Sequence, residues 1–301
     1  MNLQFIADGL IMGALIGLGA IGVTLTYSIL RFANFAHGEF LAWGTYFTLT
    51  LASGFGAMFG GSGTIGALSF GWPVIVAGLL AAFLTGLLAL LLDRILFAKL
   101  RDRGNAIVMV MASFGASMAL RSLLEFTFTS GPAYFSRDIQ MAFPIAFGIR
   151  LTPDQLFLLG MTAVLVLVME RFMALSPIGR AMRAVSENPV LARVSGVDVE
   201  RVIRATWMIG GALACAAGVM LGITVQIRPF MGFDLLLPLF AAAILGGIGS
   251  VPGAVLGGLI VGVAEAAAVQ VVGADYRAAI AFLILIAVLL VRPAGIFGVR
   301  E

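Results

Sequence analysis

The sequence of 301 residues has very few of the side chains that disulfides, metal sites and nucleotide sites require. Its one cysteine, Cys215, excludes an intramolecular disulfide, and its one histidine, His37, excludes a metal site built from several histidines. The only lysine is Lys99, and no Gly-x-x-x-x-Gly-Lys-Ser/Thr motif is present, so the chain lacks a P-loop for ATP. A single histidine also leaves no Ser-His-Asp or His-Glu-x-x-His set, which makes an enzyme a poor interpretation.

Charged residues are scarce as well. They make up 11% of the chain, against about 25% in a typical soluble domain, while hydrophobic residues make up 61%. The mean hydropathy is +1.11, and uncharged runs long enough to cross a bilayer, which takes about 20 residues, recur along the whole chain. The composition excludes a soluble globule and predicts an all-α polytopic membrane protein, with residues 1–301 forming a single transmembrane domain.

The net charge of +3 does not point to a nucleic-acid partner. Lys and Arg placed in cytoplasmic loops explain it more simply. The first apolar run, Gly9 to Leu30, has no Lys or Arg before it, so we expect no signal peptide.

Seven stretches of the chain carry no charge. They are Gly9 to Leu30, Phe40 to Leu92, Asn105 to Leu120, Gln155 to Met169, Ala205 to Ile227, Leu235 to Ala264 and Ala278 to Val291.

Two of the apolar stretches are too long for one membrane helix. Phe40 to Leu92 would make a helix of about 80 Å against a hydrocarbon core of ~30 Å, so we expect a turn within the glycine-rich segment Gly54 to Gly71. Leu235 to Val272 would reach about 57 Å and must turn once as well. Its breaker is the run Gly246 to Gly253, which leaves Leu235 to Leu245 too short to span.

The distribution of Lys and Arg gives an orientation. Asp93 to Gly104 holds four of these residues and Glu170 to Arg204 holds six, so both connections are expected in the cytoplasm. Arg121 to Arg150 holds three and includes a Gly-Pro pair, which indicates an outer loop. This orientation requires an odd number of crossings, whereas the count is about eight, give or take one. Whether Leu235 to Val251 crosses the membrane or is a re-entrant half-helix stays open.

Small residues recur at four-residue spacing, which lets helix backbones approach closely in lipid. The sets are Gly9, Gly13 and Gly17; Gly218 and Gly222; Gly253 and Gly257; and Gly258 and Gly262. Helix packing explains them without any role in transport.

The segment Arg31 to Phe40 combines polar residues with aromatic ones between two apolar runs. A fully charged group costs about 2.5 to 3.5 kcal/mol at the bilayer centre, so polar residues near the membrane interior suggest a functional site. We therefore assign Asn34, His37, Gly38 and Glu39 to a substrate pathway. The alternative is a short interfacial loop whose phenylalanines anchor at headgroup depth.

The glycine-rich break Gly246 to Gly253 is a second pathway candidate, and the helix after it carries Glu265. Broken helices are tolerated at membrane depth where they line a cavity, and their N-termini offer free N–H groups to anionic or zwitterionic substrates. Gly246, Gly247, Gly249 and Glu265 join the predicted pathway on this ground. Alternatively, Glu265 is a buried acid paired with a neighbouring helix or a side chain that reaches the membrane surface.

The basic loop Glu170 to Arg204 contains signals for short helices. Ser176-Pro177 and Asn188-Pro189 are each typical of an N-cap followed by proline at the first helical position. Gly196 can end the second helix, and Asp198 can cap the next one. A short capped helix from Pro189 to Ser195 would suit contact with a soluble partner. Alternatively, it rests on lipid headgroups, with the arginines of the loop binding lipid phosphate.

Three motifs together resemble the LivH-type permease family of branched-chain amino acid ABC importers, and the similarity extends from about residue 5 to 298. The motifs are Asn34-Phe35-Ala36-His37-Gly38-Glu39; the loop from Gly179-Arg180-Ala181-Met182-Arg183-Ala184 through Ser195-Gly196-Val197-Asp198; and Ala241-Ala242-Ala243-Ile244-Leu245-Gly246-Gly247-Ile248-Gly249-Ser250-Val251-Pro252-Gly253. The closing run Arg292-Pro293-Ala294-Gly295-Ile296-Phe297-Gly298 is also similar to that family.

The resemblance implies a subunit of the bacterial inner membrane that passes branched-chain or related amino acids to the cytoplasm. Its partners would be a second related permease, two ATP-binding subunits that hold ATP and Mg²⁺, a periplasmic substrate-binding protein and membrane lipid. No cofactor is expected in this chain.

The family's ATPase-facing loop maps onto Ser186 to Gly196, within a cytoplasmic coupling loop of residues 170–204. The residues concerned are Glu187, Asn188, Pro189, Arg193 and Gly196. Glu187-Asn188-Pro189 stands where many ABC importers have Glu-Ala-Ala, although the glycine nine residues after Glu187 is kept.

Two alternatives stay open. The first is a permease for urea, short amides or other amino acids. The second is a self-sufficient secondary transporter or channel, which would usually carry ionisable residues in several helices at membrane depth, whereas only Glu265 plainly qualifies.

Overall fold

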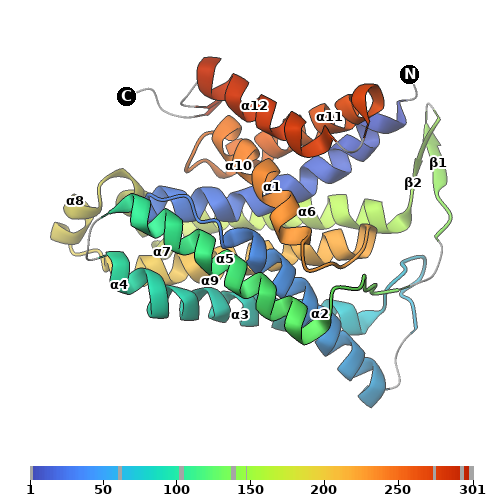
Figure 1. Ribbon diagram of the computed structural model, residues 1–301, viewed down its shortest axis with the longest axis horizontal. Helices are drawn as coiled ribbons and strands as arrows, with labels where there is room; N and C mark the ends of the chain where they lie inside the picture. Colours follow the sequence, from blue (N-terminus) through green and yellow to red (C-terminus); the bar gives the residue numbers. More distant parts are fainter. Residues whose placement is uncertain are drawn as a thin grey trace.

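The protein is described here by a computed structural model that covers residues 3–59, 63–101, 105–136, 140–146, 148–273, 276–291 and 295–297. The fold is nearly all helical (Figure 1). The longer helices are α1 (Gln4–Leu30), α2 (His37–Phe59), α3 (Trp72–Leu92), α5 (Ala106–Phe128), α6 (Pro153–Leu175), α9 (Val199–Thr224), α10 (Met231–Gly246), α11 (Val251–Val272) and α12 (Arg277–Val291).

Shorter elements connect them. A π-helical turn, η1 (Asp93–Phe97), and α4 (Ala98–Arg101) continue α3, while α7 (Pro177–Glu187) and α8 (Pro189–Val194) lie between α6 and α9. Strands β1 (Phe143–Ala146) and β2 (Ile149–Leu151) form an antiparallel hairpin. The hairpin and the pair α7–α8 lie at opposite ends of the molecule (Figure 1), as expected if they are on opposite sides of a membrane.

Six helices of the described chain are long and apolar enough to cross a bilayer. They are α1, α3 with its extension to Arg101, α5, α6, α9 and α11. α2 is also 23 residues long but starts with the polar residues His37 and Glu39, and α10 and α12 are shorter. The prediction of an all-α polytopic membrane protein with broken segments is confirmed, whereas the exact number of crossings stays a prediction.

Helix α1 lies at the centre of the bundle. It runs between α11 and α12 on one side and α3, α5 and α9 on the other (Figure 1). In its most apolar 18 residues, 72% are buried. Its small residues face α11: a Cβ atom at Gly13 would lie 2.7 Å from the Cα atom of Leu259, and one at Gly9 would lie 2.7 Å from the Cα atom of Val263. Gly258 and Gly262 approach the α1 backbone in return, which confirms the packing role of these glycines.

Two boundary expectations are confirmed and two are corrected. The chain turns between Phe59 and Trp72, inside the expected glycine-rich segment, and it breaks again between α10 and α11. However, α5 continues to Phe128, so Arg121 is a helical residue and not part of an outer loop. Similarly, α10 begins at Met231 and is 16 residues long, about 24 Å. The charge-free stretch that starts at Leu235 missed its first turn, because that turn contains Asp234.

Candidate functional site

Two helices of this bundle begin in its interior. The His37 side chain lies against Gly22 of α1, so α2 starts near the middle of the packed helices and not at their end. α10 starts beside it, because the backbone of Gly232 packs directly against that of Gly38. Each helix carries an acid in its first turn, Glu39 in α2 and Asp234 in α10, where the helix dipole favours negative charge.

The carboxylate of Glu39 is held by α5. It is 1% exposed and accepts hydrogen bonds from the Ser117 hydroxyl at 3.0 Å and from Nη2 and Nε of Arg121 at 2.9 and 3.2 Å. The Arg121 guanidinium in turn stacks on the rings of Phe230 and Phe233, with its Cζ 4.9 and 4.2 Å from their centroids. Glu39 therefore joins α2 to α5 and, through Arg121, to the start of α10.

The other predicted pathway residues of this segment are also packed. Asn34 is 3% exposed, and its Oδ1 accepts a hydrogen bond from the Ala36 N–H at 3.1 Å, which supports the turn into α2. His37 is 1% exposed and packs against the backbone of α1, since a Cβ atom at Gly22 would lie 2.6 Å from its Cε1. The same Cβ position lies 3.1 Å from the carbonyl oxygen of Gly210 in α9. Gly38 allows the close approach to α10.

The glycine-rich break is closed by hydrogen bonds. Gly247 and Gly249 have φ of +99° and +88°, a conformation that favours glycine. The Gly249 N–H donates to Thr24 Oγ1 of α1 at 2.7 Å, and the Ser250 hydroxyl caps α11 by accepting from the Gly253 N–H at 3.1 Å. The cap thus occupies one of the N–H groups at the N-terminus of α11, the groups that the sequence suggested for a ligand.

A later segment completes the other side of the break. The N–H of Ile296 donates to the carbonyl of Leu245 at 2.8 Å, and that of Phe297 donates to the carbonyl of Gly246 at 3.1 Å. These bonds satisfy carbonyls at the end of α10 that have no partner within a helix.

The two predicted pathway segments contact opposite ends of α10. Gly38 contacts Gly232 at the N-terminal end of α10. Gly246 lies 14 residues after Gly232, about 21 Å along the helix. Both segments also contact α1, where His37 packs on Gly22 and the Gly249 N–H donates a hydrogen bond to Thr24. Both segments therefore brace α1 and α10.

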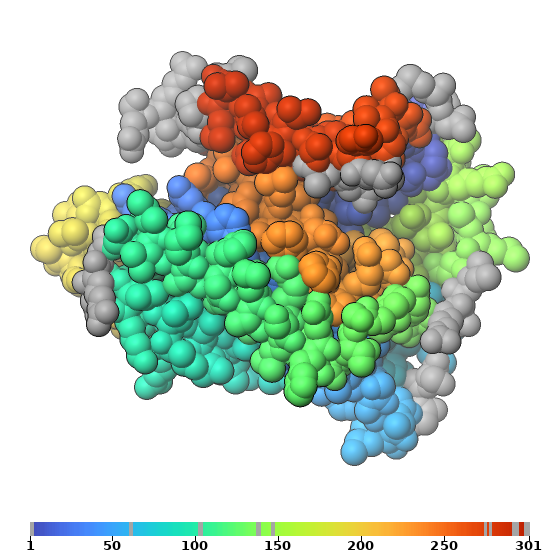
Figure 2. Space-filling view, in the orientation of Figure 1, coloured from blue at the N-terminus to red at the C-terminus, as the bar shows by residue number. Residues whose placement is uncertain are grey.

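A pocket of about 640 Å³ opens beside α10. In Figure 2, α10 and the chain before it (orange) lie between α12 (red) and α5 (green), and residues of all three helices line the pocket. Most of the wall is apolar, and it includes five phenyl rings. These belong to Phe35, Phe114, Phe233, Phe240 and Phe282. Glu265 is the only one of the predicted pathway residues that lines this pocket.

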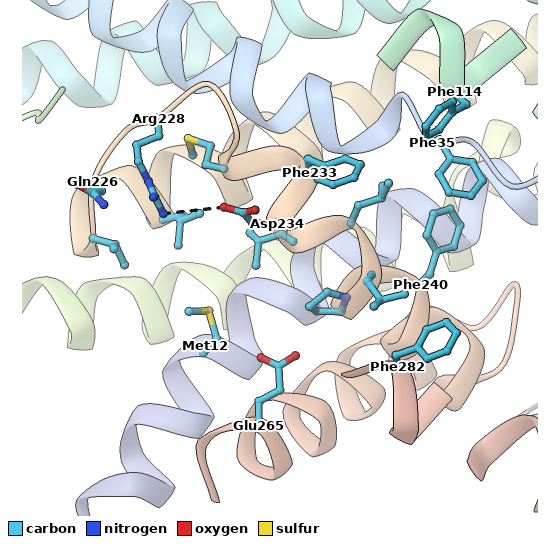
Figure 3. Close-up of a pocket in the computed structure, with 17 residues that line it drawn as sticks. Met12, Phe35, Phe114, Gln226, Arg228, Phe233, Asp234, Phe240, Glu265 and Phe282 are labelled. Carbon is cyan, nitrogen blue, oxygen red and sulfur yellow. Dashed lines mark ion pairs between the residues drawn. The ribbon is translucent and has the colours of Figure 1, made fainter. Parts of the chain in front are cut away.

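Among the described residues, three with charged side chains reach this apolar pocket (Figure 3). Arg228 and Asp234 form an ion pair at its edge, with 3.9 Å between Nη2 and Oδ2, and their side chains are 48% and 56% exposed. Glu265 comes from α11 on another side and is 2% exposed. Sequence reasoning missed Arg228 and Asp234 because they interrupt an apolar run, which made them look like the ends of a loop.

The loop between α6 and α9 has the predicted helices. Ser176 caps α7 by accepting from the Gly179 N–H, and Asn188 Oδ1 caps α8 by accepting from the N–H groups of Val190 and Leu191, both at 3.0 Å. Gly196, with φ of +88°, ends α8.

The end of α8 is a Schellman motif. The Gly196 N–H donates to the carbonyl of Arg193 at 3.1 Å, and the Val197 N–H donates to the carbonyl of Ala192 at 3.0 Å. Asp198 then caps α9 by accepting from the Arg201 N–H. All four predicted caps of this loop are confirmed.

Helix α8 has an exposed apolar surface. Val190, Leu191 and Val194 are 72%, 62% and 82% exposed, while Ala192 is buried. The Arg31 side chain, at the end of α1, donates through Nη2 to the carbonyls of Ser186 and Glu187, both at 3.2 Å. This contact joins the end of α7, just before α8, to the segment that leads into α2, and no sequence pattern indicated it.

The fold defines a multi-pass membrane protein. The model of the family described as branched-chain amino acid transport system / permease component matches residues 5–289. The chain is 33% identical to the high-affinity branched-chain amino acid transport system permease protein LivH of Escherichia coli K12, over 99% of this chain and 96% of that protein. The protein BraD of Pseudomonas aeruginosa is also 33% identical with the same coverage. The chain therefore belongs to this family of permease components of ABC transport systems.

The fold is also similar to a solved structure. PsaBC from Streptococcus pneumoniae, in complex with Fab, matches with a TM-score of 0.51 at 16% identity, over 98% of this chain and 96% of that one. At this identity the similarity concerns the fold alone.

Proposed function

We propose that this chain is the permease subunit through which an ABC importer passes branched-chain amino acids across the bacterial inner membrane. Residues 1–301 act as its one transmembrane domain. A second related permease subunit completes the passage, a periplasmic binding protein delivers the substrate, and two ATP-binding subunits hold ATP and Mg²⁺. This chain needs no cofactor and hydrolyses no ATP. The names of its relatives support the substrate class.

The pocket beside α10 is the observation that carries the proposal. Arg228, Asp234 and Glu265 line it in a protein whose helices cross the bilayer. Charged groups at membrane depth cost about 2.5 to 3.5 kcal/mol in lipid and so face a protein interior or a water-filled cavity. A second permease subunit placed over this face encloses the pocket and makes it a passage for a polar substrate.

The residues assigned from the sequence then act around that passage. Glu265 lines it directly. The packed residues Asn34, His37, Gly38 and Glu39 fix where α2 and α10 begin, and the glycines of the break fix where α10 ends and α11 begins. Bulk at Gly247 changes the position of α10 and reduces uptake in this account, because its φ of +99° favours glycine.

Reconstitution of the complete transporter tests the function. Proteoliposomes that contain this chain, its permease partner, both ATPase subunits and the binding protein should take up radiolabelled leucine when ATP is supplied. Unlabelled valine or isoleucine should compete, whereas urea and acetamide should not. The purified chain alone should neither hydrolyse ATP nor transport. Uptake by the lone chain on a proton or sodium gradient would replace this proposal with a secondary transporter.

We also propose that α8 is the contact with an ATPase subunit, with residues 170–204 as the coupling loop. Exposed Val190, Leu191 and Val194 offer an apolar surface on a rigid helix, capped by Asn188 at one end and Gly196 at the other. Arg193 and Glu187 flank that surface, and Pro189 sets its first turn. A rigid helix can transmit force from ATP hydrolysis to α1 through the Arg31 contact.

Copurification separates this role from lipid contact. Leu191→Glu should reduce the ATPase subunits that copurify with the chain by about tenfold, since it places a charge in an apolar contact. Met141→Glu is the matched control, because Met141 is 84% exposed near the hairpin at the other end of the molecule. Equal copurification of the two variants would assign α8 to the membrane surface.

A further inference from the structure

The ion pair at the edge of the pocket is held weakly. Arg228 and Asp234 are 3.9 Å apart, near the limit for an ion pair, and about half of each side chain is exposed. Pairs of this kind contribute only ~0 to 1 kcal/mol to stability. Arg228 lies three residues before the first residue of α10 and Asp234 lies in its first turn, so the two side chains flank the N-terminus of α10 at the pocket. Their position is difficult to explain by stability alone.

The two charges match the two ends of an amino acid. A guanidinium is a planar fork that binds a carboxylate with two hydrogen bonds, and the N-terminus of α10 adds to the positive potential there. The Asp234 carboxylate can accept hydrogen bonds from an ammonium group. Beside both lies a wall of aliphatic and aromatic side chains, which includes Leu236 and Phe240. Such a wall favours an aliphatic side chain by about 25 cal/mol for each Å² of apolar surface buried.

We propose that Arg228 and Asp234 form a zwitterion subsite of the passage: they release each other and bind the carboxylate and the ammonium group of a passing amino acid, whose aliphatic side chain contacts the apolar wall. The inference rests on the proposed function and adds the residues that select the substrate there. Amino acids with a charged side chain are disfavoured, because the charge would face that wall.

The exchange also explains how the subsite avoids trapping its substrate. Each new contact with the amino acid replaces part of a contact that Arg228 and Asp234 already make with each other. The net free energy of binding is therefore small, as conduction through a passage requires. A lone Arg228 without Asp234 would hold a carboxylate more strongly and release it more slowly.

Uptake by the complete transporter in vesicles tests the subsite first. The double variant Arg228→Gln with Asp234→Asn keeps a polar contact but removes both charges, so leucine turnover should fall by about tenfold or more, the loss expected for one or two charge-assisted hydrogen bonds. Arg150→Gln is the control, since Arg150 is an exposed arginine on the hairpin strand β2. Turnover within about twofold of the unmodified complex would mean that the pair only fixes the connection between α9 and α10, and would overturn the proposal.

Photocrosslinking gives a second measurement that a merely structural pair would not alter. A diazirine analogue of leucine, supplied during ATP-driven uptake, should label the α10 peptide that contains Leu236 and Phe240, and the charge-free double variant should lose that label. Labelling that is unchanged in the double variant, or absent from α10 in a complex that transports leucine normally, would refute the subsite while the proposed function stands. If the unmodified complex takes up no branched-chain amino acid at all, the proposed function fails, and the subsite fails with it.

Discussion

Neutralising Glu39 should destabilise the protein in a way that reveals its partner. Glu39→Gln leaves Arg121, whose side chain is 12% exposed, without its charged partner. Removing one member of a buried ion pair costs about 3 to 5 kcal/mol. Arg121 keeps its contacts with Ser117 and with two phenyl rings, which are worth ~0.5 to 2 kcal/mol, so we expect a loss near the lower end, about 3 kcal/mol.

The single cysteine provides the assay. Cys215 is fully buried, so a dye that fluoresces on reaction with a thiol reports unfolding of the detergent-solubilised chain during heating. Glu39→Gln should lower the midpoint by about 5 °C or more. Glu125→Gln serves as control, because Glu125 is partly exposed on the same helix as Arg121.

A double-mutant cycle then isolates the pair. Arg121→Gln should also destabilise the protein, but the double variant Glu39→Gln with Arg121→Gln should lose much less than the sum of the two, because neither charge is left alone. If the two effects add, or if Glu39→Gln behaves like Glu125→Gln, then the carboxylate and the guanidinium do not depend on each other and the reasoning from the hydrogen bonds is wrong.

Three further substitutions have defined outcomes. Gly258→Leu inserts bulk where α11 meets the α1 backbone and should lower the unfolding midpoint, whereas Gly54→Leu, with no atom within 4 Å of its Cβ position, should not. Thr24→Val removes the acceptor of the Gly249 N–H, a loss of about 1 to 3 kcal/mol, and should reduce uptake unless the hydroxyl is restored as serine. Arg31→Gln removes the bonds to the end of α7 and should lower the amount of leucine transported per ATP hydrolysed, while the ATPase subunits stay bound. An unchanged ratio would show that force does not pass through this contact.

The local features of the fold could be read from the sequence because their signals are local. Serine or asparagine before proline predicted the starts of α7 and α8, and Gly196 predicted the end of α8, since each cap involves atoms within a few residues. The glycines spaced by four likewise predicted a packing face, although the sequence did not say that those of α1 would pack on α11.

The burial of Arg121 could not be predicted because it depends on a partner that is distant in the chain. Its partner Glu39 is 82 residues away in the chain. A search for charge-free stretches therefore placed Arg121 in a loop, whereas Glu39 neutralises its charge inside the bundle. The same search started the apolar stretch after Asp234, so it missed the first turn of α10 and the position in the interior where that helix begins. Buried charges mislead such a search wherever a distant partner compensates them.

The hydrogen bonds from Ile296 and Phe297 to the end of α10 have a consequence for biosynthesis. A ribosome makes the end of α10 about fifty residues before it makes those two donors, and α11, which ends at Val272, also precedes them. During that interval the carbonyls of Leu245 and Gly246 lack their final partners, so the break between the helices can hold its mature shape only after α12 has been inserted. The order of synthesis thus postpones the last step of assembly, and a ribosome stalled after α11 should leave a nascent chain that is cleaved by membrane proteases more readily than one stalled after residue 297.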